Sequence, residues 1–592
     1  MVLRVADPTY DEQCARLSDM YVEVVIVRSE DVQPAPMDDD AMPRPYEPVD
    51  VLAAQATPPI TSTSARGPIH PADLFQPRTR RVLLKGQPGM GKTTFLNKLC
   101  TDWCAGLLPM FDWVFLLPLR DLSDGDCRSK QSLAEVLHTQ LRECMPRGFT
   151  HEDLDELMNE SPSRVLILLD GYDEFDPACC PVINDFIRGT NTSRRLVLTT
   201  RPSALESLEA LTCRPGKPFD TKADVLGFGP GAQEEYAGKF FSEPQHADMA
   251  ASLRTQLQSS MMLRGLLQSP LMLRFACALT LNRWTPTSST EALPRTITKL
   301  FTEINKYKIE CAQQDLGGSV TRGAIDDALA QLQELAWWGI EQGRLHFSLA
   351  DLAARGIDVV AGAPLPLALQ LGFLQRKMRG GGGGRGTTVT VGEFWCFPHL
   401  AMQENLAACW LVSNGTVMTI FETLGGQGHH DIAPRFDMVW RFASGLLKET
   451  GARELIQAIV CAATRQSTRR LTIVTLQCIA EAASDVTEEQ AVGLRALLQP
   501  ITAEGKLDLA DSSLSRLDMC NLAEVLPTLT LMSLNLSANT LDDEMATTLA
   551  GALVGCTALR RVVYVRRGSE TRSEFMFAFL LVYSSGRIAT FR

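Results

Sequence analysis

The feature that most constrains this chain is a glycine-rich loop between an apolar strand and a helix pattern, at residues 82–96, VLLKGQPGMGKTTFL. Its spacing, Gly86-x4-Gly91-Lys92-Thr93, is the pattern of a phosphate-binding P-loop. Glycines let the backbone turn tightly and aim its N–H groups inward, so these donors and the helix N-terminus can surround a β-phosphate. The residues expected to bind nucleotide here are Gly86, Gln87, Pro88, Gly89, Met90, Gly91, Lys92, Thr93 and Thr94.

Two side chains of this loop have their own chemistry. Lys92 can neutralise β- and γ-phosphate oxygens, and the Thr93 hydroxyl can ligate Mg²⁺. The sequence therefore predicts an α/β P-loop domain that binds a nucleotide together with Mg²⁺.

The second half of the predicted site lies at residues 165–174, VLILLDGYDE. Five apolar residues indicate a buried parallel strand, and Asp170 stands at its carboxyl end, where doubly wound sheets place ligand-binding groups. We expect Asp170 to hold Mg²⁺ through water and Asp173 and Glu174 to orient an attacking water. A third strand, 196–200, ends at Arg201, which is placed to reach a γ-phosphate.

Together these segments resemble a known family. The loop GQPGMGKTT, the strand end LLDGYDE and the segment LVLTTRPSAL are similar to the NACHT module of NOD-like receptors, which are P-loop switches of the STAND class. Downstream, SPLMLRFAC (269–277) resembles the proline-bearing segment of the family's first helical domain, and FWCFPHLAMQENLAACWL (394–411) resembles its winged-helix signature. The resemblance implies that Pro270 lies at the nucleotide. It also implies that His399 contacts the β-phosphate of ADP and helps to hold a closed state.

Composition agrees with a multidomain globular protein. A chain of 592 residues is too long for one core, and 45% hydrophobic with 21% charged residues is ordinary for globular proteins. A net charge of −12 argues against a nucleic-acid binder that depends on phosphate contacts. No stretch reaches the ~18 apolar residues of a membrane helix. The 16 cysteines form no CxxC pair, which is typical of buried thiols in a reducing cytosol, so we expect a cytoplasmic protein.

The order of patterns along the chain predicts seven segments. The first 70 residues are predicted to be an N-terminal extension, with a strand-like piece at 21–27 and a linker over 31–70. This part has no recognisable effector domain, because it lacks a six-helix amphipathic pattern. Next come the nucleotide-binding domain (71–230), a first helical domain (231–318), a winged-helix domain (319–412), a second helical domain (413–500), leucine-rich repeats (501–566) and an atypical tail (567–592). Gly380–Gly384 lack the strand–loop–helix context of a phosphate site and indicate a hairpin tip.

The repeats are predicted from two matching spacings. KLDLADSSL (506–514) and SLNLSANTL (533–541) share the pattern L-x-L, 27 residues apart from Leu507 to Leu534. Leu559 follows Leu531 after 28 residues within a similar pattern, and Asn539 occupies the turn position. This period is that of leucine-rich repeats, each made of a strand and a helix. The tail breaks the period, which suggests that the repeat array is truncated.

These expectations lead to one functional hypothesis and two rivals. The main hypothesis is an innate immune switch that is locked by ADP when closed, opens and oligomerises on exchange for ATP, and hydrolyses ATP slowly as a reset. The expected partners are adenine nucleotide, other copies or related chains, and a protein or ligand on the repeats. One rival is a metabolic P-loop enzyme, which would need an acceptor site. The other is a nucleotide-independent scaffold or a decoy that lacks an effector domain.

Overall fold

The structure of the protein, a computed structural model, describes residues 21–29, 74–76, 78–122, 127–141, 145, 148–189, 194–211, 219–283, 293–315, 320–359, 366–378, 393–415, 417–419, 421, 433–466, 468–502, 504–564 and 588–591. The expected linker over 31–70, the glycine run 380–384 and most of the tail lie outside these residues. Among the described residues, no helix is both long and apolar enough to cross a lipid bilayer.

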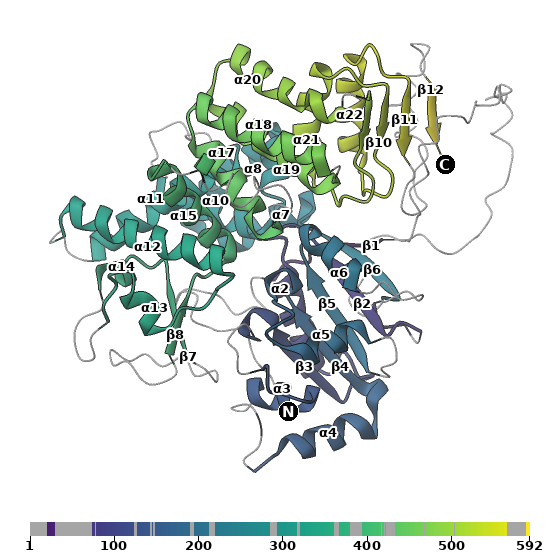
Figure 1. Ribbon diagram of the computed structural model, residues 1–592, viewed down its shortest axis with the longest axis vertical. Helices are drawn as coiled ribbons and strands as arrows, with labels where there is room; N and C mark the ends of the chain where they lie inside the picture. Colours follow the sequence, from purple (N-terminus) through teal and green to yellow (C-terminus); the bar gives the residue numbers. More distant parts are fainter. Residues whose placement is uncertain are drawn as a thin grey trace, which may run out of the picture.

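A six-stranded sheet forms the part of the molecule that carries the phosphate loop (Figure 1). Its order is β1-β6-β2-β5-β4-β3, and all its neighbours are parallel except the edge pair β1–β6. The strands are β1 (Val25–Ser29), β2 (Arg81–Lys85), β3 (Trp113–Pro118), β4 (Val165–Asp170), β5 (Arg195–Thr200) and β6 (Thr221–Gly227). Because β2, β4 and β5 are parallel neighbours, the loop, Asp170 and Arg201 all follow the same edge of the sheet.

Helices cover both faces of this sheet, which explains why its central strands are apolar throughout. In β4 every residue is buried: Leu166 and Leu168 join a core that contains Leu96, whereas Ile167 and Leu169 join a second core with Ile183. The helices of this part are α2 (Lys92–Cys104), α3 (Leu133–Leu141), α4 (His151–Glu160), α5 (Pro181–Arg188) and α6 (Leu205–Leu211). The expected α/β P-loop architecture is therefore present.

One expected boundary needs correction. The first 70 residues were predicted to lie outside the nucleotide-binding domain, with a strand over 21–27. Instead, β1 runs from Val25 to Ser29 and pairs antiparallel with β6, so that Ile26 faces Val225. Ile26 is buried in the same core as Leu96. A segment before the linker thus completes the edge of the sheet, a pairing that no local sequence pattern specifies.

Helices dominate the chain after the sheet (Figure 1). The first group comprises α7 (Pro230–Phe240), α8 (Ala247–Ser259), α9 (Met261–Leu266), α10 (Pro270–Arg283) and α11 (Ile297–Asp315). Next come α12 (Arg322–Gln342), α13 (Leu349–Ala353), α14 (Leu367–Gln370), the antiparallel pair β7 (Gln375–Met378) and β8 (Glu393–Cys396), and α15 (Leu400–Ser413). The last group comprises α17 (Asp437–Leu446), α18 (Glu449–Gln466), α19 (Arg469–Ala482) and α20 (Glu488–Arg495). The β7–β8 pair lies where a winged hairpin is expected, and the name winged helix stays a prediction.

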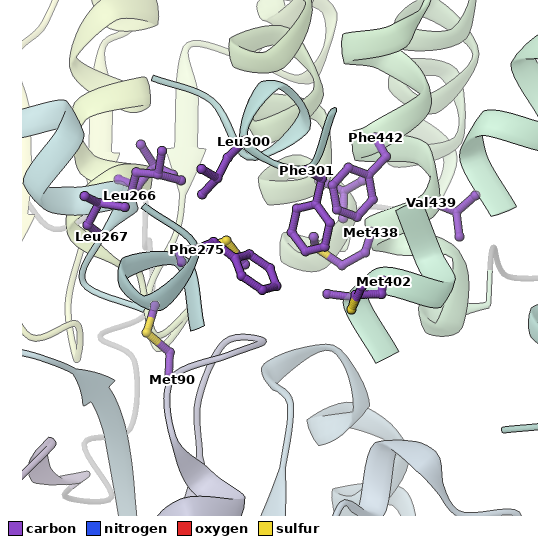
Figure 2. Close-up of a cluster of buried hydrophobic side chains, with 14 of the residues drawn as sticks. Met90, Leu266, Leu267, Phe275, Leu300, Phe301, Met402, Met438, Val439 and Phe442 are labelled. Carbon is purple, nitrogen blue, oxygen red and sulfur yellow. The ribbon is translucent and has the colours of Figure 1, made fainter. Parts of the chain in front are cut away.

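An aromatic core joins three of these helices above the phosphate loop (Figure 2). Phe301 of α11 lies edge-to-face with Phe275 of α10 and with Phe442 of α17, at centroid distances of 5.5 Å and 5.1 Å. Met90 of the loop points toward this group from below and is buried in the same core. The conformation of the loop is therefore coupled by packing to helices far along the chain.

The C-terminal part alternates strands and helices. It contains β9 (Lys506–Asp508), α21 (Arg516–Val525), β10 (Ser533–Asn535), α22 (Asp543–Val554), β11 (Arg561–Tyr564) and β12 (Ile588–Phe591), and its sheet is parallel. Leu507, Leu534 and Val562 share one register, as the 27- and 28-residue spacings require. The Asn539 side chain donates to Leu509 O at 2.7 Å and accepts from Ser512 N at 3.2 Å, so it ties its own unit to the preceding one. This geometry agrees with stacked repeats, whose assignment as leucine-rich stays a prediction.

Candidate functional site

The phosphate loop is shaped by glycines and closed on one side by the start of α10. Gly89 and Gly91 have φ angles of 75° and 90°, which L-amino acids with side chains rarely adopt. Ser269 donates from Oγ to Gly89 O at 3.0 Å. A Cβ on Gly89 would lie 2.5 Å from Ser269 Oγ, so a larger residue does not fit here. A Cβ on Gly91 would lie 3.6 Å from Pro270. Pro270 thus lies beside the loop, and its contact with a nucleotide stays a prediction.

Lys92 lies within the loop itself. Its ammonium donates to Gly86 O at 2.6 Å and to Gln87 O at 3.1 Å. Burial lowers its pKa, although the nearby Asp173 opposes this shift. A cation fixed among loop carbonyls is suited to binding phosphate oxygens.

A hydroxyl and a carboxylate meet at the end of β4. Thr93 Oγ1 donates to Asp170 Oδ2 at 2.8 Å, and Thr199 Oγ1 donates to Asp170 Oδ1 at 2.7 Å. Oxygen ligands of this kind suit Mg²⁺, which takes one or two protein ligands and completes its shell with phosphates and waters. Thr93 and Asp170 would therefore hold the ion, which would neutralise phosphate charge. The donor set present fits that group.

Arg201 links the sheet to the helical part. Its Nε lies 2.9 Å from Asp173 Oδ2, its backbone N–H donates to Asp173 Oδ1, and its Nη1 donates to Glu404 Oε1 of α15 at 2.7 Å. Burial alone would lower the pKa of Arg201, but Glu404 and Asp173 raise it above its usual value. The arginine expected to approach a γ-phosphate is therefore held by two carboxylates.

Glu174 has the electrostatic setting of a proton acceptor. It is partly buried beside Arg120, whose Nη1 lies 3.9 Å from Glu174 Oε2. Burial raises its pKa to about 7, Arg120 and Arg201 oppose the shift, and Asp173 and Asp170 add to it. A carboxyl with a pKa near neutrality suits general base catalysis.

His399 caps the helix that carries Glu404. Its Nδ1 accepts a hydrogen bond from Ala401 N at 3.0 Å, so the neutral ring holds its proton on Nε2. Burial, together with the positive charges of Arg201, Arg120 and Lys92, lowers its pKa to about 3. The surroundings of His399 are thus electropositive, and its contact with a nucleotide phosphate stays a prediction.

The structure thus brings most of the predicted residues together. Around the loop and the strand ends lie Gly86, Gln87, Pro88, Gly89, Met90, Gly91, Lys92, Thr93, Asp170, Asp173, Glu174, Arg201, Pro270 and His399. Two of the predicted residues differ in detail. The Met90 side chain is buried beside Gly227, so only its backbone is free to serve a phosphate, and Thr94 is exposed in the first turn of α2.

Four residues of the site were missed by sequence reasoning. Arg120 follows β3 as Arg201 follows β5, so its position after an apolar strand was a usable signal. Glu404 and Ser269 belong to segments that carry the family resemblance, although no local pattern indicates their partners. Thr199 is the penultimate residue of a buried strand and gave no signal.

Comparison with known proteins finds similarity over this part of the chain. Residues 80–244 match the NACHT domain. The protein "NACHT, LRR and PYD domains-containing protein 3" of Homo sapiens is 26% identical over 360 residues, which cover 57% of this chain and 31% of that protein. "NLR family CARD domain-containing protein 4" of Rattus norvegicus is 27% identical over 285 residues, which cover 47% and 25%. The chain thus spans about a third or less of the length of these curated relatives.

A solved structure from Pyrococcus horikoshii, a Signal Transduction ATPase with Numerous Domains protein with a tetratricopeptide repeat sensor, is also similar. It is 12% identical, with a TM-score of 0.27, and the match covers 85% of this chain and 68% of that one.

Proposed function

Since this chain belongs to the NACHT-domain NOD-like receptor family, we propose that it is an ATP/ADP-binding molecular switch of innate immune signalling. In the closed state ADP is held by the phosphate loop and by His399. Exchange for ATP releases the helical part and allows assembly with other copies or related chains. The observation that carries this proposal is the ion pair between Arg201 and Glu404, which joins the nucleotide site to α15.

The physical reason is competition for one cation. Arg201 forms ion pairs with Asp173 and Glu404 in the present arrangement. A γ-phosphate at the loop would offer it a third negative partner. If Arg201 turns toward the phosphate, the buried Glu404 loses its ion pair, and breaking a buried pair costs about 3–5 kcal/mol. ATP can shift the equilibrium only by its differential affinity for the two states, and this exchange of partners provides such a difference.

Hydrolysis is proposed as a slow reset. Thr93 and Asp170 would hold Mg²⁺, which neutralises phosphate charge, and Glu174 with Asp173 would orient water. Burial raises the pKa of Glu174 to about 7, which supports its role as a proton acceptor. The protein is proposed to work in the cytoplasm, with a protein partner or ligand on the repeats.

The test is mass spectrometry of the nucleotide released from freshly purified, denatured full-length protein. Wild type is compared with Lys92→Ala and with Lys98→Ala, a lysine on the same helix whose ammonium pairs with Asp102 outside the loop. We expect stoichiometric ADP in wild type and in Lys98→Ala, and its loss in Lys92→Ala. A well-folded wild type without nucleotide would overturn the switch and favour the nucleotide-independent scaffold.

A further inference from the structure

A segment outside the matched domain contacts the phosphate loop. The family match covers residues 80–244, whereas β1 and the residues just before it, here called the N-terminal segment (21–29), come well ahead of that range in the chain. Figure 1 shows β1 beside β6 at the edge of the sheet. None of the site residues described above belongs to this segment. The family match therefore assigns it no role.

The N-terminal segment is attached to the sheet by one apolar face. Val22, Val24 and Ile26 are buried in the core that contains Leu96 of α2, whereas Glu23 between them is exposed. This alternation is the period of a strand that is covered on one face. In the described part of the sheet, β1 pairs only with β6, because it stands at the end of the strand order. An edge strand held on one side separates from a sheet more readily than a central strand.

Val24 packs against the phosphate loop at Gly91. This glycine directly precedes Lys92 and has a φ of 90°. A Cβ built on Gly91 would lie 3.0 Å from Val24 Cγ1 and 3.6 Å from Pro270 Cγ. Gly91 is thus packed by one side chain of the N-terminal segment and by one of α10. Without Val24 the loop would gain space at this point, and the position of Lys92 would be less fixed.

The N-terminal segment also contacts the first helix after the sheet. Lys239 of α7 donates from Nζ to Tyr21 O at 2.7 Å, and it pairs with Glu235 of the same helix at 2.8 Å. A Cβ on Gly229, the N-cap of α7, would lie 3.6 Å from Val25 Cγ2. One short segment therefore touches the sheet, the phosphate loop and α7. A movement of α7 away from the sheet would break at least one of these contacts.

From these contacts we propose that the N-terminal segment controls how fast nucleotide leaves the loop. Val24 is then a positioning residue that keeps Gly91 and Lys92 in their phosphate-binding arrangement. This inference rests on the proposed function, in which the loop holds ADP. While the segment is docked, ADP leaves slowly; when α7 moves away, Tyr21 loses Lys239, the segment loosens and ADP leaves faster. By linkage, bound nucleotide in turn stabilises the docked segment.

The first experiment measures the release of mant-ADP, a fluorescent ADP analogue, from the full-length protein after a chase with excess ADP. Val24→Ala removes the contact with Gly91, so we expect release about tenfold faster than in wild type. Val27→Ala is the matched control, because Val27 lies on the opposite, less buried face of the same strand. It should release mant-ADP at the wild-type rate.

A second pair of variants tests the contact with α7 without changing the core. Lys239→Met keeps the apolar stem but removes the donor to Tyr21 O, and it should speed release about threefold or more. It also loses the pair with Glu235. Lys306→Met loses a comparable pair within one helix, with Glu303, and should release at the wild-type rate.

Hydrogen exchange over residues 22–29 separates positioning from a merely structural role. ADP should slow exchange of this segment in wild type and have little effect in Val24→Ala, whereas a structural role alone predicts the same exchange with and without ADP. A wild type that does not bind mant-ADP would overturn the proposed function and this inference with it. Tight binding with equal release rates in Val24→Ala and Val27→Ala would overturn only the role of the N-terminal segment.

Discussion

Arg201, at the end of β5, donates to Glu404 of α15 at 2.7 Å, across 203 residues of chain. Glu404 is 2% exposed, and its second carboxylate oxygen has no hydrogen-bond partner among the described residues. Burial raises the pKa of Glu404, and Arg201 opposes that shift. The carboxylate therefore depends on Arg201 for its charge compensation, and this ion pair joins the sheet to α15.

This dependence makes Glu404→Gln a test of the closed arrangement. The substitution keeps the shape of the side chain but removes the charge, and Arg201 retains only Asp173. We expect the closed state to lose about 3 kcal/mol relative to open states, the low end of the cost of breaking a buried pair. Limited proteolysis and sedimentation velocity should show faster cleavage and more oligomer. Glu449→Gln, which breaks an i,i+4 pair with Arg453 on α18, should behave as wild type. Equal behaviour of the two variants would contradict this coupling.

Removal of Mg²⁺ tests whether Thr93 and Asp170 hold the ion. Thr93 and Asp170 are hydrogen-bonded at 2.8 Å, where both can serve as oxygen ligands. We expect EDTA to weaken ATP binding in wild type and to have a much smaller effect in Thr93→Ala, because that variant has already lost a ligand. Isothermal titration calorimetry with and without Mg²⁺ measures the difference. Thr101→Ala, farther along α2, is the matched control. An equal Mg²⁺ effect in wild type and Thr93→Ala would remove Thr93 from the ion site.

His399 should make stability depend on pH. Its folded pKa of about 3 lies below the ordinary value of about 6.5, so the neutral ring contributes stability at higher pH that is lost as pH falls from about 6.5 toward 3. His399→Asn keeps an N-cap acceptor but does not titrate. In protein without nucleotide, we expect the melting temperature to fall between pH 7 and pH 5 by a few degrees more in wild type than in the variant. Scanning fluorimetry that gives identical pH profiles would show that His399 does not control this dependence.

The two halves of the site differ in how far the sequence predicts them. The ends of β2, β4 and β5 follow from continuous apolar runs, and parallel pairing then brings Lys92, Asp170 and Arg201 to one edge. The sequence shows Glu404 only as part of a motif. Its pairing with Arg201 could not be predicted, because it depends on how α15 packs against the sheet. Edge strand β1 was expected near its place but outside the sheet, since strand pairing across a long interval has no local signature.

The contact between Lys85 and Asp511 also joins distant segments without a local sequence signal, and it gives a further prediction. Lys85 ends a buried strand, is 1% exposed, and donates to Asp511 at 2.8 Å, with Asp224 3.5 Å away. Asp511 has a φ of 51°, which asparagine tolerates well, so Asp511→Asn should keep the backbone. We expect it to weaken the contact by about 1.5–3 kcal/mol and to increase hydrogen exchange over 506–514. Asp543→Asn on α22 is the control, and unchanged exchange in Asp511→Asn would show that this contact does not hold the C-terminal part.

The packing of α12 against α15 supports a prediction with an internal control. A Cβ on Gly339 would lie 2.8 Å from both Arg344 O and Phe347 Cζ and would also meet Gln403 of α15. We expect Gly339→Ala to destabilise the protein by about 1–3 kcal/mol, because the core has no room for a methyl group. Gly323 lies on the same helix with nothing within 4 Å of a built Cβ. There the same substitution should stabilise by about 0.5–1 kcal/mol, since alanine favours the helix. Thermal unfolding of both variants measures the difference. A Gly339→Ala protein as stable as Gly323→Ala would mean that α15 can move away from α12, and with it the residues that hold Arg201.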